Sequence, residues 1–284
     1  MKLPISAIIL TYNEELNLES CLKNIADWAN EIIIIDSFSA DKTLEIAKKY
    51  TNKIAQRTFV NQAEQFNWAL DNLNIKNDWI LRLDADEYLT EELKQEIDRI
   101  NLSSSQDDNI NGYYMKRRVY FMGRWIKHGG YYPTRLLRLF RKGKARSELR
   151  AMDEHIVLSE GKAEKLKNDF IDDNKKDLTW WINKHNNYAS REAEEIKNIR
   201  TSDVLNINGK LNGQVARKRW FKENFYHRLP LFCRAFFYFL YRYFFRLGFL
   251  DGKEGLIFHF LQGFWYRFLV DAKLYEAKKE IRKN

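Results

Sequence analysis

Four consecutive isoleucines, Ile32 to Ile35, stand between Glu31 and Asp36 and constrain the fold more than any other stretch. A short apolar run without alternation is typical of a strand buried on both faces, as in a parallel sheet covered by helices. Other apolar runs and segments of helical spacing alternate along the first hundred residues, at 5–10, 17–28, 41–50, 54–59, 62–72, 79–83 and 90–100. This alternation predicts βαβ units on a mainly parallel sheet, an α/β fold.

The pattern changes after residue 100. The polar run 101–111 predicts a loop and a boundary, and Gly209 and Gly213 mark a second break. Between them, two further strands and a long helix are expected, at 112–120, 136–140 and 177–199. We therefore predict three parts, covering residues 1–100, 101–213 and 214–284.

Charge and cysteine content narrow the class of protein. The chain of 284 residues has a formal net charge of +9, which favours an anionic partner such as nucleic acid, anionic lipid or a phosphorylated sugar. Cys21 and Cys233 lie far apart and have no partner motif, which indicates a reducing compartment without a disulfide or zinc framework. The first residues lack the pattern of a signal peptide, so none is expected.

About half of the aromatic residues fall between Trp220 and Phe268. On a helical wheel Arg234, Arg242 and Arg246 fall within an arc of about 120°, and aromatic residues occupy the opposite side. No stretch there reaches the roughly 18 uncharged apolar residues of a typical spanning helix. We predict amphipathic helices lying on an anionic membrane, with the arginines toward lipid phosphates. A helical core is the alternative, and nucleic acid is not an expected partner because no nucleic-acid motif is present.

Polar clusters follow the predicted strands, at the sheet edge where ligands of open α/β sheets collect. Thr11, Tyr12 and Glu14 follow the first strand, and Asp36 and Arg57 close the second and third. The fourth strand ends in the pair Asp84 and Asp86, whose i, i+2 spacing suits one divalent cation that in turn holds a diphosphate. Together these clusters predict a metal-assisted enzyme that uses a nucleotide-sugar.

These motifs resemble the family 2 glycosyltransferases of the GT-A fold. The resemblance is carried by residues 4–14, 35–43, 65–70 and 83–87, and continues in 123–130, 137–143 and 246–255. Within the family the chain is most similar to bacterial lipopolysaccharide-core β-glucosyltransferases. The fold class implied is a Rossmann-like mixed, mainly parallel sheet with flanking helices, followed by the C-terminal membrane-associated helices.

The resemblance also implies roles for individual residues. Nucleotide contacts are implied for Thr11, Tyr12, Glu14, Asp36, Arg57, Asn67 and Asp84. Asp86 and Asp84 would bring Mn²⁺ or Mg²⁺ to the diphosphate, and Asp172 would be the third ligand, with His155 as the alternative. Glu154 is the expected general base of an inverting displacement, and Asp153 is its rival.

Two departures from the family pattern qualify this assignment. Phe66 stands where relatives usually carry a basic residue, and the Gln-x-x-Arg-Trp element of processive members is absent, which favours transfer of one sugar per acceptor. The predicted function is transfer from a nucleotide-sugar, a UDP-sugar in the first place, to a lipid-linked saccharide at the cytoplasmic face of the inner membrane. Transfer to polyprenyl phosphate, with Arg117, Arg118, Arg135 and Arg138 as a phosphate site, is the runner-up, and a non-catalytic nucleotide-sugar-binding scaffold is a third possibility.

Overall fold

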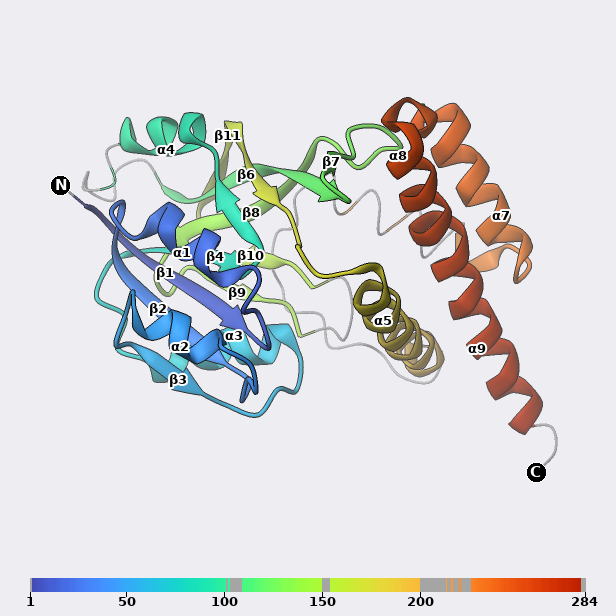
Figure 1. Cartoon of the computed structure of the whole chain (residues 1–284), viewed down its shortest axis with the longest axis horizontal. Helices are drawn as coiled ribbons and strands as arrows, with labels where there is room; N and C mark the ends of the chain where they lie inside the picture. Colours follow the sequence, from blue (N-terminus) through green and yellow to red (C-terminus); the bar gives the residue numbers. More distant parts are fainter. Residues whose placement is uncertain are drawn as a thin grey trace.

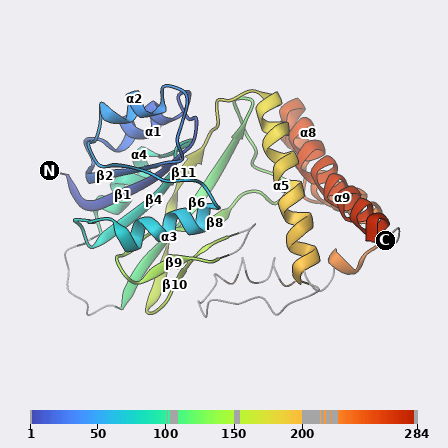
Figure 2. The same ribbon diagram turned by 90° about the horizontal axis from the view of Figure 1, so that it is seen from below.

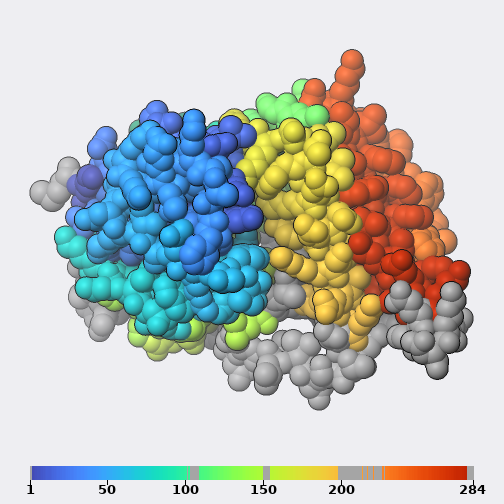
Figure 3. Space-filling model, turned by 60° about the horizontal axis from the view of Figure 1, so that its bottom comes forward, coloured from blue at the N-terminus to red at the C-terminus, as the bar shows by residue number. Residues whose placement is uncertain are grey.

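The computed structural model describes residues 2–100, 109–149, 154–199 and 226–281, together with the single positions 102, 213, 216 and 220. An α/β body carries both the N-terminal half and the middle of the chain, and a group of C-terminal helices lies beside it (Figure 1). Helix α5 (Leu178–Ile199) runs between these two parts in the space-filling view, where it is yellow (Figure 3).

The central sheet has the strand order β3-β2-β1-β4-β8-β6-β11-β5. The bounds of these strands are Ile54–Gln56, Ala29–Asp36, Leu3–Thr11, Trp79–Asp84, Thr134–Arg141, Ile110–Phe121, Lys162–Asp172 and Glu87–Leu89. The first four are parallel, as are β6 and β11, whereas β8 and β5 run antiparallel to their neighbours. The short strand β7 (Arg124–Trp125) pairs with β6, and β9 (Ala145–Ser147) pairs with β10 (Ile156–Leu158).

Helices cover both faces of the sheet, as four consecutive isoleucines require. Helices α1 (Leu18–Ile25) and α2 (Thr43–Lys48) lie on one face, and α3 (Gln62–Asn72) and the β9–β10 hairpin lie on the other (Figure 2). Helix α4 (Glu91–Asp98) adds Leu93 and Ile97 to the first face and begins at the predicted N-cap, Thr90. All four isoleucines are buried, alternately in the two cores.

The strand order creates a switch point at β1. From β1 the chain moves outward to β2 and β3, then returns to place β4 on the other side of β1. In open α/β sheets a crevice forms outside the carboxyl ends of the two strands at such a point. Thr11 ends β1 and Asp84 ends β4, so the topology brings the predicted polar clusters to one edge.

The C-terminal segment is helical from Cys233 onward. Its elements are α7 (Cys233–Leu240), η3 (Tyr241–Phe245), η4 (Gly248–Asp251), α8 (Gly252–His259), η5 (Phe260–Trp265) and α9 (Tyr266–Ile281). Helix α9 packs along α5 through an apolar contact that includes Ala193 and Val270. Within the described ranges, no helix is both long and apolar enough to span a bilayer.

The predicted orientation of the C-terminal arginines is wrong for two of the three. Arg234 is buried and forms an ion pair with Asp271 of α9, and Arg242 donates to the Gly129 carbonyl oxygen at 2.6 Å. Arg246 is exposed, as expected. A helical wheel identifies which residues share a face, but the acidic and carbonyl groups of neighbouring segments decide whether that face is covered.

Two segments that carried the family resemblance contact each other across the fold. The carboxylate of Asp251 accepts from the His128 backbone N–H at 2.9 Å and lies 2.6 Å from His128 Nδ1. The buried ring of His259 fills the space beside Gly129, where a Cβ atom would approach within 2.0 Å of it. This contact joins the loop after β7 to the C-terminal helices, and it explains why Gly129, at φ +66°, has no side chain.

Other differences from the predicted elements are local. Strand β3 ends at Gln56 instead of Phe59, and α1 is shorter than the predicted helix. Strands β5, β9, β10 and β11 were not predicted, because they are short or rich in lysine and glutamate. The three-part division at residues 100 and 213 stays a prediction.

Candidate active site

The loops after β1 and β2 are bonded to each other at the sheet edge. The backbone N–H of Asn13 donates to Ser39 Oγ at 2.8 Å, and that of Glu14 donates to Thr43 Oγ1 at 2.7 Å. Asp36 is fully buried at the centre of this arrangement and accepts from Thr11 Oγ1 at 3.0 Å. These hydrogen bonds hold the two loops in place without a ligand.

The residues predicted to contact the nucleotide differ in whether their side chains already have protein partners. Tyr12 is 58% exposed in the loop after β1, where its ring is available to stack on a base. Arg57 forms an ion pair with Glu64 and lies 5.0 Å from the Trp68 ring centre. Asp36 also accepts from the Ser39 N–H and from Gln56 Nε2, so both of its oxygens already have protein partners.

Asn67 lies on the α3 side of the sheet. Its amide exchanges two hydrogen bonds with the backbone of Ser147 in β9, at 2.9 Å each, and thereby holds the β9–β10 hairpin against α3. A contact between Asn67 and a nucleotide would require these bonds to break. Its role as a nucleotide contact stays a prediction that no contact in the structure supports.

A buried charge cluster supports the end of β4. Asp84 lies between Arg82 at 3.4 Å and Arg138 at 3.3 Å, and its N–H donates to Glu87 at 2.9 Å. Burial opposes ionisation of Asp84, but Arg82, Arg138 and Lys184 outweigh it and lower its pKa. Burial and the neighbouring acids raise the pKa of Glu87 even though Arg138 contacts it. The cluster keeps Asp84 ionised and fixed in position.

Asp86 and Asp172 complete the acidic edge. Asp172 ends β11 opposite Glu87 of β5, and Arg117 lies 3.5 Å from its carboxylate. Asp86 accepts from Asn174 Nδ2 at 2.7 Å, and its carbonyl oxygen accepts from the Asp173 N–H. Burial, followed by the charges of Asp86 and Asp84, raises the pKa of Asp172. The third predicted metal ligand therefore lies near the other two.

This donor set fits a divalent cation. Carboxylate oxygens are the hard ligands that Mn²⁺ and Mg²⁺ favour, and crowding of Asp84, Asp86 and Asp172 leaves negative charge that a cation would offset. In the part of the chain that the structure describes, no group of three or more acidic, histidine or cysteine side chains is arranged to hold a metal ion. A bound diphosphate would supply the oxygens that the protein does not.

Helix α5 contributes a residue that the sequence analysis did not assign. Lys184 interacts electrostatically with Asp84, Asp86, Asp172 and Glu14, which belong to three strand ends. Glu14 itself is held by Lys176 at 2.7 Å and by Asn17. The sequence placed Lys184 on a helix, but nothing in it indicated which way that helix faces.

The predicted general base lies beside the β9–β10 hairpin. Glu154 is half-buried and lies two residues before β10 begins, and His155 accepts from the Glu148 N–H at 2.9 Å through its carbonyl oxygen. Asp153, the rival base, lies outside the described residues. The assignments of Glu154 and His155 stay predictions.

The four arginines named for a phosphate site face acidic side chains in three cases. Arg138 contacts Glu87, Arg117 lies near Asp172, and Arg118 donates to Asp169 at 2.6 Å. Arg135 lies on β8. The cluster is therefore engaged within the protein and is not an open anion site.

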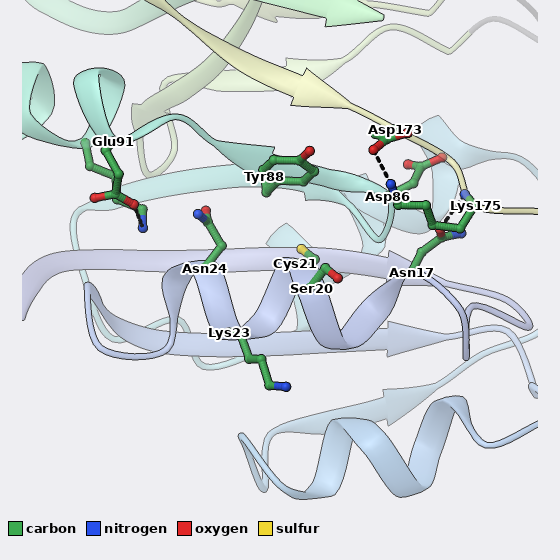
Figure 4. Close-up of a pocket in the computed structure, with 11 residues that line it drawn as sticks. Asn17, Ser20, Cys21, Lys23, Asn24, Asp86, Tyr88, Glu91, Asp173 and Lys175 are labelled. Atoms are coloured by element: carbon green, nitrogen blue, oxygen red, sulfur yellow. Dashed lines mark hydrogen bonds and ion pairs between the residues drawn. The ribbon is translucent and has the colours of Figure 1, made fainter. Parts of the chain in front are cut away.

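A groove of about 420 Å³ opens next to Asp86, between α1 and the segment that follows β11 (Figure 4). Its lining includes Asn24, Tyr88 and Lys175 in addition to Asp86. It includes none of Tyr12, Asp36 and Arg57. The groove therefore adjoins Asp86 without reaching the residues predicted to hold the base.

Comparison with known proteins decides the family. Residues 6–147, half of the chain, match the sequence profile described as "Glycosyl transferase family 2". The chain belongs to glycosyltransferase family 2. The mannosyltransferase PcManGT from Pyrobaculum calidifontis, solved in complex with GDP-Man and Mn²⁺, has a similar fold, with a TM-score of 0.54 at 14% identity over 98% of this chain and 88% of that one. The predicted GT-A fold is thereby confirmed.

Curated relatives align over part of their length. An uncharacterized glycosyltransferase of Rickettsia bellii (strain RML369-C) is 40% identical over 103 residues, which is 36% of this chain and 34% of that protein. The lipopolysaccharide core biosynthesis glycosyltransferase LpsC of Rhizobium meliloti (strain 1021) is 31% identical over 165 residues, 56% of this chain and 59% of LpsC. The chain thus spans between about a third and three fifths of these relatives, and the predicted similarity to lipopolysaccharide-core enzymes is confirmed.

Proposed function

We propose that this protein transfers one sugar from a UDP-sugar to a lipid-linked saccharide, with inversion, in the biosynthesis of a lipopolysaccharide or related cell-surface glycan. The observation that carries the proposal is the convergence of Asp84, at the switch point of a family 2 fold, with Asp86 and Asp172, which the pairing of β5 with β11 brings together. Such a convergence of carboxylates contributes little to a core and is typical of a functional site.

The donor would lie across the ends of β1 and β4. Tyr12 would stack on the base, and the ordered loops after β1 and β2 would hold the ribose. Asp84 and Asp86 would hold Mn²⁺ or Mg²⁺ at the diphosphate, and the cation would supply Lewis-acid stabilisation of the departing phosphate. The neighbouring arginines keep Asp84 ionised, which is the state that metal binding requires.

Glu154 would act on the acceptor. Its carboxylate would remove the proton of the attacking hydroxyl group as that oxygen bonds to the anomeric carbon. The bond between this carbon and the phosphate oxygen breaks in the same displacement, so the configuration inverts. Neither the donor sugar nor the linkage position follows from these residues.

The acceptor side would face an anionic membrane through an exposed apolar surface, here called the aromatic face. It consists of Phe236, Phe237, Tyr241, Phe244, Phe245, Leu247, Phe249, Leu250, Leu256, Ile257 and Phe260. Phe245 is 79% exposed, and this one group of helices leaves eleven large apolar side chains exposed to solvent. Arg246 and Lys253 are exposed beside this face and would meet lipid phosphates. We infer a peripheral position at the cytoplasmic face of the inner membrane.

Transfer to polyprenyl phosphate has less support, because Arg117, Arg118 and Arg138 contact acidic residues of the protein. The proposal is tested by incubating the protein with membrane extract and a panel of UDP-, GDP- and ADP-sugars, followed by mass spectrometry of the lipid fraction. One added sugar on a saccharide-bearing lipid, dependent on one nucleotide-sugar, is the expected result. A sugar attached directly to polyprenyl phosphate, or no product with any donor, would contradict it.

A further inference from the structure

Lys184, in the second turn of α5, carries a charge that no acidic side chain of the described residues neutralises by direct contact. Its Nζ lies 4.6 Å from the Trp180 ring centre and 5.7 Å from the Tyr188 ring centre. Among the described residues it forms no ion pair and no hydrogen bond with a carboxylate. Its stem and ammonium are held by aromatic rings, which fix its position and leave its N–H groups available.

The field at Lys184 comes from the acidic edge of the sheet. Burial opposes the charge, yet the pKa of Lys184 is raised, because Tyr188, Asp86, Glu14 and Asp172 favour the protonated form. Asp86 follows β4, Glu14 follows β1 and Asp172 ends β11. Lys184 is therefore within electrostatic range of three strand ends, and the Trp180 ring that it contacts also contacts Lys176, the partner of Glu14.

Lys176 contacts the same tryptophan as Lys184 but forms an ion pair with an acidic residue. Its Nζ lies 4.4 Å from the same Trp180 ring centre and pairs with Glu14 at 2.7 Å. The two lysines thus contact one ring, and they differ in that Lys176 has an acidic partner. The ammonium of Lys184 has N–H groups to donate, and it lies near the carboxylates that would hold a cation and its diphosphate. Such a group can bind a phosphate oxygen through a charge-assisted hydrogen bond.

We propose that Lys184 binds the β-phosphate of the donor nucleotide and stabilises the diphosphate as it leaves. This inference rests on the proposed function. When the acceptor oxygen bonds to the anomeric carbon, the bond from that carbon to the β-phosphate oxygen breaks and its electron pair stays on the phosphate. Lys184 keeps its proton and offsets the added negative charge, while the acceptor proton goes to the general base.

The test compares UDP with UMP, which share base, ribose and α-phosphate and differ in the β-phosphate. Calorimetry with MnCl₂ would measure both affinities for the wild type and for Lys184→Met, which keeps the packing between the rings. A charge-assisted phosphate contact predicts that UDP affinity falls roughly 10- to 100-fold and UMP affinity changes less than about threefold. Lys184→Arg should recover part of the UDP affinity.

Lys279→Met is the matched control, since Lys279 is an exposed lysine of α9 whose Nζ also lies beside an aromatic ring, 5.4 Å from the Tyr275 ring centre. Its ratio of UDP to UMP affinity should equal that of the wild type. Equal losses for UDP and UMP in Lys184→Met, or unchanged affinity for both, would overturn the β-phosphate assignment.

The design separates this inference from the function on which it rests. A wild-type protein that binds GDP in preference to UDP would refute the uridine donor, and the same comparison would then use GDP and GMP. A wild-type protein that binds no nucleoside diphosphate would refute the proposed function together with the inference. A wild type that binds UDP beside an unaffected Lys184→Met refutes the inference alone.

Discussion

The sheet edge and the C-terminal helices differ in how well the sequence predicts where their charged side chains lie. At the sheet edge, Asp84 ends β4 at the switch point, and the pairing of β5 with β11 brings Asp172 opposite Glu87 and so close to Asp86. In the C-terminal helices, Arg234 and Arg242 turned inward and the aromatic side chains turned outward. Topology fixes the first arrangement, whereas the second depends on partners as distant in sequence as Gly129 and Asp271.

Substitutions at the sheet edge should reduce turnover more than substitutions elsewhere in the protein. Asp86→Ala should reduce turnover by at least about 10³-fold, because it removes a ligand of the Lewis acid, whose stabilisation is worth several kcal/mol. The melting temperature should not fall, since the change relieves repulsion that raises the pKa of Asp172. Initial rates with and without EDTA, together with thermal melts, check both points.

Asp71→Asn is the control, because Asp71 pairs with Arg146 at the surface. Full turnover in excess EDTA, or an active Asp86→Ala variant, would show that activity does not require a divalent cation at this site.

The second prediction concerns the arginines that turned inward. Arg234→Met should lower the free energy of unfolding by about 3–5 kcal/mol, because it leaves the buried carboxylate of Asp271 without its partner. Arg246→Met, at an exposed site, should change it by less than about 0.5 kcal/mol. Urea denaturation of the two variants measures the difference. Equal stabilities would indicate that Arg234 faces outward, as the helical wheel predicted.

The third prediction tests Glu154. Glu154→Gln should lower turnover roughly 10²-fold and leave UDP affinity unchanged, since a general base facing the acceptor does not contact the nucleotide. Glu160→Gln is matched to it, because Glu160 lies past the end of β10 and pairs with the exposed Lys144. If Glu154→Gln weakened UDP binding while turnover stayed near wild type, Glu154 would belong to the donor site.

The smallest expected effect is on membrane binding. Replacing Phe237 and Phe244 by serine should reduce partitioning onto phosphatidylglycerol liposomes about 10-fold or more, because they are 61% and 52% exposed and each would newly bury about half of a side chain that is worth about 1.5–3 kcal/mol in full. Val60→Ser, at an apolar residue 60% exposed in the N-terminal half, should not change flotation. Flotation of the serine variant equal to wild type would show that the aromatic face covers something other than lipid.

Much of the N-terminal half was predictable, because local signals agree there. The isoleucine run, the Thr90 cap and the polar ends of β1, β2 and β4 each point to the observed elements. The acidic pair was visible as a spacing, and Asp172 was placed through the family resemblance.

The rest was hidden because it depends on contacts distant in sequence. Lys184 is one lysine among 48 basic residues, and α5 orients it through contacts with Trp180, Tyr188 and α9. The ion pair of Arg234 requires Asp271, which lies 37 residues later. The Asn67 amide, predicted to face a nucleotide, is held by β9, a strand too short to be recognised from its sequence.

The central claim is that the donor binds at the strand ends while the aromatic face binds the membrane. Hydrogen–deuterium exchange on the full chain tests both parts in one measurement. UDP with Mn²⁺ should slow exchange in residues 11–17 and 84–89, and phosphatidylglycerol liposomes should slow exchange in residues 236–260 without affecting the first two segments. Protection of the strand ends by liposomes, or UDP protection absent from those segments, would contradict the account.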